Sequence, residues 1–188
     1  MICVAQAHMR LFRAVIPTPL GDMLALASEE GLCALEFTIV EGPNRGQERL
    51  SRLNARLQRW FPSHEILDRD TSTIARTRDW LTAYFEGTRA EIGDLPLDMR
   101  GAPFEKRVWM ALQAIPPGQT TSYGAMAQAL GSAGASRAVG AANGANPVAI
   151  IVPCHRVIGS SGSLTGYGGG LERKRWLLEL EGAPAPRA

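Results

Sequence analysis

Cysteine is scarce in this sequence. The 188 residues include three cysteines, Cys3, Cys33 and Cys154, and no two of them form a Cys-x-x-Cys pair. Three scattered cysteines cannot form a disulfide framework, and a free thiol fits a reducing compartment. No apolar stretch approaches the roughly 20 residues that a membrane span needs, and the N-terminus lacks the pattern of a secretion signal. We therefore expect a cytoplasmic protein without a membrane segment.

Net charge is also small. The formal value of +2 does not by itself indicate a nucleic-acid partner. Residues 1–100 hold 12 Arg and 14 Asp plus Glu, a balance of −2, whereas residues 101–188 hold 8 Lys plus Arg and 4 Glu, a balance of +4. The positive excess in the second part suits a small footprint on DNA phosphates, and it equally suits an ordinary solvated surface.

The first part of the chain is predicted to contain both strands and helices. Helical periodicity of apolar residues occurs at 47–61 and 71–85, with a short strand expected at 66–67. Earlier apolar segments, separated by Pro and Gly, favour antiparallel strands at 11–16, 23–27 and 32–39. Pro96 and Gly101 mark a linker. We expect an N-terminal domain at 1–92, a linker at 93–101 and a C-terminal domain at 102–188.

The second part is predicted to be mostly helical. The spacing of apolar residues, together with residues that typically begin or end helices, indicates four helices. They run from 103 to 115, from 121 or 122 to 130, from 135 or 136 to 143, and from 171 to 181. The second and third of these are short and are joined by a glycine-bearing turn. This arrangement is typical of a helix-turn-helix.

The third of these helices has few large side chains apart from that of Arg137. A helix that reads the major groove needs several long polar side chains, which this helix lacks. A smooth helix with one arginine suits close approach to the minor groove. Tight packing in a protein core remains the alternative for a helix of small residues.

A possible nucleophile follows an apolar run. Ile150, Ile151 and Val152 favour a buried, strand-like segment, and Pro153 then precedes Cys154 and His155. A thiol attacks as thiolate, so its ordinary pKa of about 8.5 must be lowered by a neighbouring group such as His155. A small buried hydrophobe is the other reading of a lone cysteine, but a rigid proline before the thiol argues against it.

The sequence around Cys154 resembles a known active-site block. The segments that carry the resemblance are Pro153-Cys154-His155-Arg156-Val157, Asn146-Pro147, Gly166-Tyr167-Gly168-Gly169-Gly170, Thr121-Ser122-Tyr123-Gly124 and Ser136-Arg137-Ala138-Val139-Gly140. Together they are similar to the bacterial O6-alkylguanine-DNA alkyltransferases, the methylated-DNA–protein-cysteine methyltransferase family. The resemblance runs from about 104 to 182 and is faint before that.

The resemblance implies both a fold and an activity. The fold is an α/β, ribonuclease-H-like N-terminal domain that braces a mostly α C-terminal domain with a winged-helix-like helix-turn-helix. The activity is direct reversal of DNA damage, in which the alkyl group of O6-alkylguanine moves irreversibly, once per molecule, to Cys154 after nucleotide flipping. O4-alkylthymine is a second expected substrate. The expected partner is double-stranded DNA, bound through the minor groove by a monomer that can bind cooperatively, and no cofactor is expected.

The resemblance also assigns roles to residues of the reaction. Cys154 would accept the alkyl group, and His155, acting through a water, would be the base. Glu181 would hold the imidazole of His155, as in other Cys-His-carboxylate relays. Tyr123 would push the target phosphate and donate a proton toward the base, and Asn146 would pin the turn before the active site.

DNA and pocket contacts are assigned in the same way. Arg137 would fill the gap that the flipped nucleotide leaves. Tyr123 and three further residues would contact DNA: Ala138, Ala142 and Asn143. The pocket for the base would be lined by the Val157 carbonyl and by Tyr167 and Gly168. Gly168 stands where some relatives have serine, so only a backbone N–H is available there.

Some relatives bind a structural zinc in the N-terminal domain. Cys3, His8, Cys33 and His64 are the right residue types, but they lack recognisable ligand spacing, so we expect no metal.

Two other classes of protein share parts of this pattern. A cysteine hydrolase brings its histidine from a distant segment, whereas adjacent side chains on an extended chain point to opposite faces. The alkyltransferase-like DNA-damage sensors lack the acceptor cysteine, which this chain keeps as Cys154.

Overall fold

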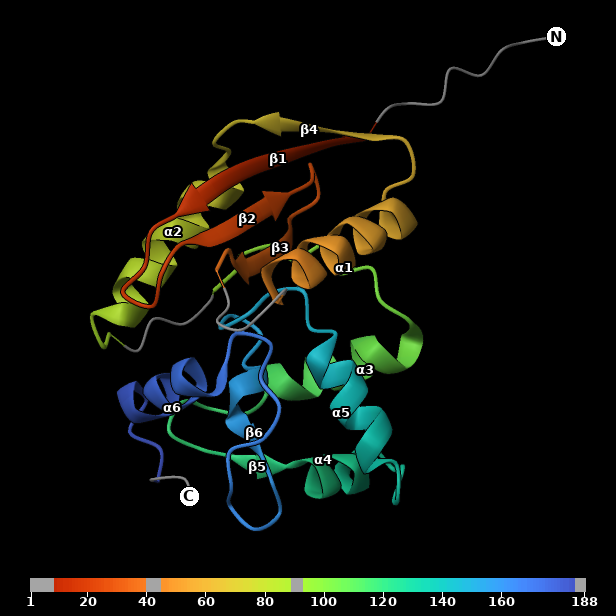
Figure 1. The fold of residues 1–188 in the computed structure, drawn as a ribbon, viewed down its shortest axis with the longest axis vertical. Helices are drawn as coiled ribbons and strands as arrows, with labels where there is room; N and C mark the ends of the chain where they lie inside the picture. Colours follow the sequence, from red (N-terminus) through yellow and green to blue (C-terminus); the bar gives the residue numbers. More distant parts are fainter. Residues whose placement is uncertain (1–8, 40–44, 89–92, 185–188) are drawn as a thin grey trace, which may run out of the picture.

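The computed structural model describes residues 9–39, 45–88 and 93–184. Its N-terminal part contains a four-stranded sheet in the order β3-β2-β1-β4 (Figure 1). The strands are β1 (Met9–Ile16), β2 (Met23–Ala27), β3 (Leu32–Phe37) and β4 (His64–Asp68). Strands β1, β2 and β3 pair in this order and antiparallel, which confirms the predicted antiparallel strands, and β4 pairs with β1 in parallel.

Two helices accompany this sheet. Helix α1 (Arg45–Trp60) buries Leu53, Leu57 and Trp60, which recur at helical spacing and so lie on one face. Helix α2 (Ser72–Phe85) packs against β2. Its N-terminus is capped by Thr71, whose hydroxyl accepts a hydrogen bond from the amide of Ile74 at 3.3 Å. Both predicted helices and the short strand between them are confirmed.

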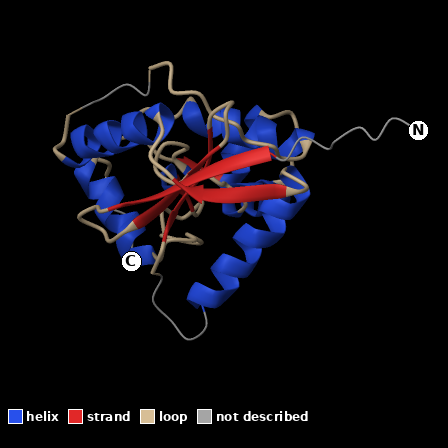
Figure 2. Cartoon of the chain, turned by 90° about the horizontal axis from the view of Figure 1, so that it is seen from above, coloured by secondary structure: helices blue, strands red, loops and turns tan. Residues whose placement is uncertain are grey.

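The C-terminal part is mostly helical, as predicted. Its elements are α3 (Pro103–Gln113), β5 (Thr121–Ser122), α4 (Tyr123–Ala129), α5 (Ser136–Gly144), the 3-10 helix η1 (Cys154–Arg156), β6 (Val157–Ile158) and α6 (Leu171–Leu180). The Ser122 hydroxyl caps α4 by accepting from the amide of Ala125 at 3.1 Å. Helices α4 and α5 form the helix-turn-helix, and both α3 and α4 pack against α5. Seen from above, the strands occupy the centre and the helices surround them (Figure 2).

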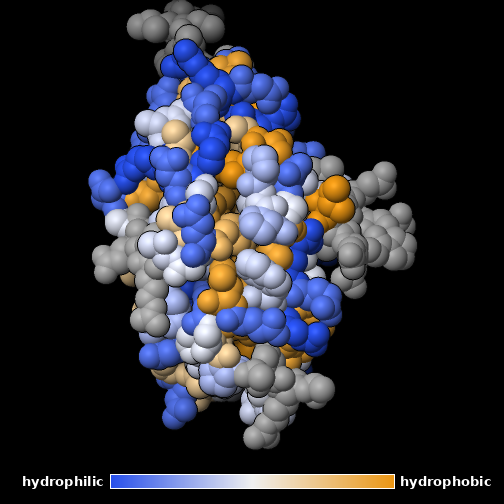
Figure 3. All heavy atoms as spheres, turned by 90° about the vertical axis from the view of Figure 1, so that its left-hand side faces the viewer, coloured by the Kyte–Doolittle hydropathy of each residue, from blue (hydrophilic) through white to orange (hydrophobic). Residues whose placement is uncertain are grey.

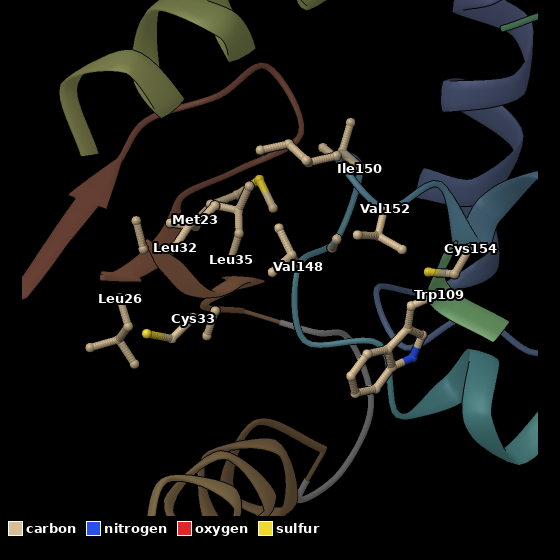
Figure 4. Close-up of a cluster of buried hydrophobic side chains, with 14 of the residues drawn as sticks. Met23, Leu26, Leu32, Cys33, Leu35, Trp109, Val148, Ile150, Val152 and Cys154 are labelled. Carbon is tan, nitrogen blue, oxygen red and sulfur yellow. The ribbon is translucent and has the colours of Figure 1, made fainter. Parts of the chain in front are cut away.

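The two parts meet along β3. The amide of Leu35 donates to the carbonyl of Pro147, and the amide of Ala149 donates to the carbonyl of Leu35, both at 2.9 Å. Figure 4 shows the side chains of this junction, with Val148 beside Leu35 and Cys154 at the far end near Trp109. The segment that leads to Cys154 is therefore anchored on the N-terminal sheet.

The prediction of a strand-like run at 150–152 is wrong. Among residues 148–152, Val148 alone forms a bridge with β3, after which the chain turns and the amide of Val152 donates to the carbonyl of Val148 at 2.9 Å. Ile150 adopts φ of 70°, which is unusual for a β-branched residue. The run is buried as expected, but it reaches Cys154 through successive turns.

The surface that carries α2 and α6 shows small hydrophobic patches among hydrophilic residues (Figure 3). Within the described ranges, no helix is both long enough and apolar enough to span a membrane.

Candidate active site

Cys154 begins the 3-10 helix η1 at the wall of a cavity. The cavity has a volume of about 300 Å³, and the cysteine is 7% exposed. The amide of Cys154 donates to the carbonyl of Val152 at 2.8 Å, which closes the turn before the helix. Opposite, the loop from Gly166 to Gly169 lines the same cavity. A Cβ on Gly169 would lie 2.6 Å from the Tyr167 ring, so only glycine allows this close packing.

The N-terminal part lines this cavity as well. Glu36 of β3 and Arg56 of α1 face it, and the Arg56 guanidinium donates to the Glu36 carboxylate at 2.6 Å. A second, more open hollow adjoins the first and includes Tyr123 and Gly140 among its walls. The residues that line both hollows are Arg52, Gly144, Gly166, Tyr167 and Gly168. The exposed side of the helix-turn-helix thus leads toward Cys154.

Glu181 links the residues that follow Cys154. Its carboxylate, 2% exposed, accepts from Nε2 of His155 at 2.9 Å and from Nη2 and Nε of Arg156 at 2.7 and 2.8 Å. Burial alone would raise the pKa of Glu181, but these hydrogen bonds outweigh it and lower the pKa to about 2. The carboxylate is therefore ionised at neutral pH. The structure thus brings His155, which directly follows Cys154, into contact with Glu181, the pairing that the family resemblance implies.

The imidazole of His155 is buried and neutral. Burial lowers its pKa, against the opposing effect of the Glu181 carboxylate. A neutral imidazole that donates from Nε2 to Glu181 leaves Nδ1 as an acceptor. Nδ1 is buried without a hydrogen-bond partner among the described residues. The free lone pair at Nδ1 can take a proton.

Asn146 fixes the turn before the active site. Its Nδ2 donates to the carbonyl of Val152 at 2.7 Å, and its Oδ1 accepts from the amide of Val148 at 3.0 Å. Both backbone groups belong to the turns that lead to Cys154. The side chain thus holds together a segment that lacks the ladder of a strand.

Tyr123 begins α4, and its hydroxyl lies 3.4 Å from the carbonyls of Thr165 and Gly166. Burial raises the pKa of this phenol, so it keeps its proton. The long distances indicate weak hydrogen bonds. The hydroxyl can therefore leave these carbonyls for a bound partner.

Lys174 was missed by sequence reasoning, because a lysine on a surface helix is expected to face solvent. It is fully buried on α6, where its Nζ donates to the carbonyls of Val157 and Thr165 at 2.6 and 2.5 Å. Burial lowers the pKa of Lys174 to about 8. The Val157 carbonyl thus accepts a hydrogen bond from Lys174. Of the residues expected to line the base pocket, Tyr167 and Gly168 line both hollows, and Val157 lines neither.

Helix α5 has one face exposed to solvent and one face buried in the protein, and the residues expected to contact DNA are divided between the two. Arg137 and Ala138 are exposed, but Ala142 and Asn143 are each 3% exposed and point inward. Asn143 Nδ2 donates to the Cys154 carbonyl at 3.4 Å, and the carbonyl of Ala142 accepts from Trp109. Both side chains thus lie away from the exposed face of α5, and Asn143 lines the cavity beside Cys154 instead. The exposed face of α5 is formed by Arg137, Ala138, Ala141 and Gly144.

The residues considered for zinc do not form a site in the part that the structure covers. Cys3 and His8 lie outside the described residues. Cys33 is fully buried in the sheet, and burial raises the pKa of its thiol to about 12. The described residues contain no group of three or more His, Cys, Asp or Glu that could hold a metal ion.

Comparison with known proteins gives matches along most of the chain. Residues 11–99 match the ribonuclease-like domain of 6-O-methylguanine DNA methyltransferase, and residues 103–183 match its DNA-binding domain. The methylated-DNA–protein-cysteine methyltransferase of Salmonella typhimurium is 46% identical over 93% of this chain and 97% of its own length. That of Mycobacterium tuberculosis is 54% identical over 73% of this chain and 82% of its own.

Solved structures of the same family are similar to this chain along most of its length. The crystal structure of the M. tuberculosis protein OGT in complex with DNA is 43% identical, with a TM-score of 0.72, over 94% of this chain and 96% of that one. The O6-methylguanine-DNA methyltransferase of Pyrococcus kodakaraensis is 26% identical, with a TM-score of 0.65, over 92% and 99%. The predicted two-part fold is thereby confirmed. By its domains, its sequence and its structure, the chain belongs to the 6-O-methylguanine DNA methyltransferase family.

Proposed function

We propose that this chain repairs duplex DNA by moving the alkyl group of O6-alkylguanine to the sulfur of its own Cys154. One observation carries the proposal: Cys154 lies at a cavity wall next to a neutral, buried His155 with an unfilled acceptor at Nδ1, and Glu181 holds the other side of that ring. The relatives named above act on methylated DNA and a protein cysteine.

The residues account for each proton in the reaction. The Cys154 thiol gives its proton through a water to Nδ1 of His155, and Glu181 stabilises the imidazolium that forms. The sulfur attacks the alkyl carbon, the bond from carbon to O6 breaks, and the electron pair stays with guanine. The Tyr123 hydroxyl donates a proton toward the ring nitrogen of the leaving base and regains one from the His155 imidazolium by way of water, so the proton that leaves Cys154 is balanced by the one that guanine gains. The product thioether cannot return to a thiol, so each chain acts once.

The alkylated base can reach Cys154 only if the damaged nucleotide rotates out of the base stack of the duplex. The exposed face of α5 carries small side chains and Arg137, which suits entry into the minor groove with the arginine filling the gap. The adjoining hollows then receive the flipped base between Tyr123 and the loop that contains Tyr167 and Gly168. O4-alkylthymine, which presents an alkylated oxygen in the same way, is a second substrate.

The remaining features of the proposal follow from the same chemistry. A reactive free thiol requires a reducing compartment, so the chain works in the cytoplasm. It acts as a monomer that binds DNA cooperatively, and alkyl transfer to a thiol needs no cofactor. The division into residues 1–92, 93–101 and 102–188 separates a supporting domain, a linker and the domain that carries Cys154.

The test compares three chains on a duplex that contains one O6-methylguanine. The unmodified chain should gain the mass of one CH₂, because a methyl replaces the thiol hydrogen. Cys154→Ala should bind the duplex with nearly unchanged affinity and gain no mass, since base and phosphate contacts do not involve the thiol. Cys33→Ala is the matched control and should be methylated like the unmodified chain. A mass gain in Cys154→Ala contradicts the proposal.

A further inference from the structure

Tyr84 connects the N-terminal part of the chain to the alkyl-transfer site. It lies in the last turn of α2, is 7% exposed, and its hydroxyl is 2.7 Å from Oε1 of Glu181. Burial and the negative charge of Glu181 raise the pKa of Tyr84. The phenol therefore keeps its proton and is the donor of this hydrogen bond. Nothing in the proposed mechanism uses it.

Several groups compete for the Glu181 carboxylate. Oε1 accepts from Tyr84, from Nε2 of His155 and from Nη2 of Arg156, while Oε2 accepts from Nε of Arg156. Each donor takes up part of the negative charge, so less remains to stabilise a protonated His155. The positive charges of Arg156 and Lys174 act on His155 in the same direction. On its remaining side, the His155 ring meets the Tyr167 ring edge-on at 6.4 Å.

Aromatic neighbours hold the phenol in place. The ring of Tyr84 stacks on Trp80 at 5.2 Å and meets the edge of Phe85 at 5.4 Å. Phe85 in turn lies 5.7 Å from Trp176 of α6, so α2 and α6 contact each other beside the carboxylate. These two helices lie on the same side of the molecule (Figure 1). The hydroxyl thus reaches Glu181 from a preorganised ring.

We propose that Tyr84 is a positioning residue of the alkyl-transfer site, supplied by the N-terminal part of the chain. Its hydroxyl fixes Oε1 of Glu181 and takes up part of its charge, which keeps His155 an unprotonated base at neutral pH. The N-terminal part therefore tunes the chemistry and does more than brace the other domain. This inference rests on the proposed function, because that function assigns His155 as the base.

The test is Tyr84→Phe in the full chain, which removes the hydroxyl and keeps the ring. The titration of the His155 imidazole is followed by NMR with labelled histidine. Without Tyr84, Oε1 keeps more charge for His155, so the pKa of His155 should rise by roughly 0.5 to 1 unit. The acid limb of the rate of Cys154 alkylation by free O6-benzylguanine should move to higher pH by the same amount.

Trp176→Leu is the matched control. It removes the aromatic contact with Phe85 at the same interface and leaves the Tyr84 ring its contacts with Trp80 and Phe85, so it should lower the melting temperature and leave the His155 titration unchanged. An unshifted His155 in Tyr84→Phe, or an equal shift in Trp176→Leu, overturns the inference. Failure of the unmodified chain to alkylate Cys154 overturns the proposed function instead. The NMR titration distinguishes the two failures, because it needs no alkyl donor.

Discussion

Replacing Glu181 with glutamine removes the charge that the buried site is built around. The carboxylate is 2% exposed, and the Arg156 side chain paired with it is 8% exposed. Breaking a buried ion pair by removing one partner costs about 3–5 kcal/mol, because the other charge is left buried and uncompensated. The shift in the pKa of Glu181 from 4.5 to about 2 gives a similar value of about 3 kcal/mol, at about 1.4 kcal/mol per pH unit. Either figure is large against a total stability of roughly 5–15 kcal/mol.

The pH dependence of this loss has a definite sign. The pKa of Glu181 is lower in the folded chain than in the unfolded chain, so its charge stabilises the fold fully above about pH 4.5. That contribution is lost as the pH falls toward 2, where the wild-type carboxyl is protonated and resembles glutamine. The stability difference between the two chains should therefore be constant near neutral pH and shrink by about 1.4 kcal/mol per unit below 4.5.

Urea unfolding of both chains, followed by tryptophan fluorescence from pH 3 to 7, measures this difference. Glu179→Gln is the matched control, because Glu179 lies in the last turn of α6, two residues before Glu181, and is exposed. It should change the stability little at any pH. A Glu181→Gln effect below about 1 kcal/mol, or one that does not vary with pH, would refute the reasoning about the buried carboxylate.

Three other substitutions test separate parts of the account. Arg137→Ala should slow repair in duplex DNA roughly tenfold or more relative to reaction with free O6-benzylguanine, which needs no flipping, and equal losses on both substrates count against the assigned role. Asn146→Ala should lower the free energy of unfolding by about 1–3 kcal/mol for each of the two backbone groups left unsatisfied, measured by urea unfolding. Ser122→Ala removes the cap of α4 and should cost about 1 kcal/mol in the same assay, and an unchanged midpoint would show that the cap is dispensable.

Local patterns predicted most of the elements. The apolar segments of β1 to β3 and the helical spacing of α1 and α2 appear where the sequence placed them, because burial on one face imposes a period that can be read along the chain. The turn at 150–152 could not be predicted this way. Its β-branched residues favour a strand, but the Asn146 side chain and a single bridge to β3 decide its conformation.

The sequence indicated the residues of the candidate active site only where they belong to a recognisable motif or to the family resemblance. Cys154 and His155 are adjacent in the sequence, and Glu181 came from the family resemblance. Tyr84 lies 97 residues from Glu181, and no local pattern indicates that they touch. Lys174 was missed for a related reason, since its two carbonyl partners come from other segments of the fold. Contacts between distant segments depend on tertiary packing, which no local sequence pattern specifies.

Transfer of an isotopically labelled methyl from O6-methylguanine in duplex DNA is the direct measurement of alkyl transfer to Cys154. The chain is incubated with excess labelled duplex, digested, and its peptides are analysed by mass spectrometry. We expect one labelled methyl per chain, all of it on Cys154, with no further loss of O6-methylguanine once that site is filled. Label on another residue, or repair of more than one lesion per chain, would contradict it.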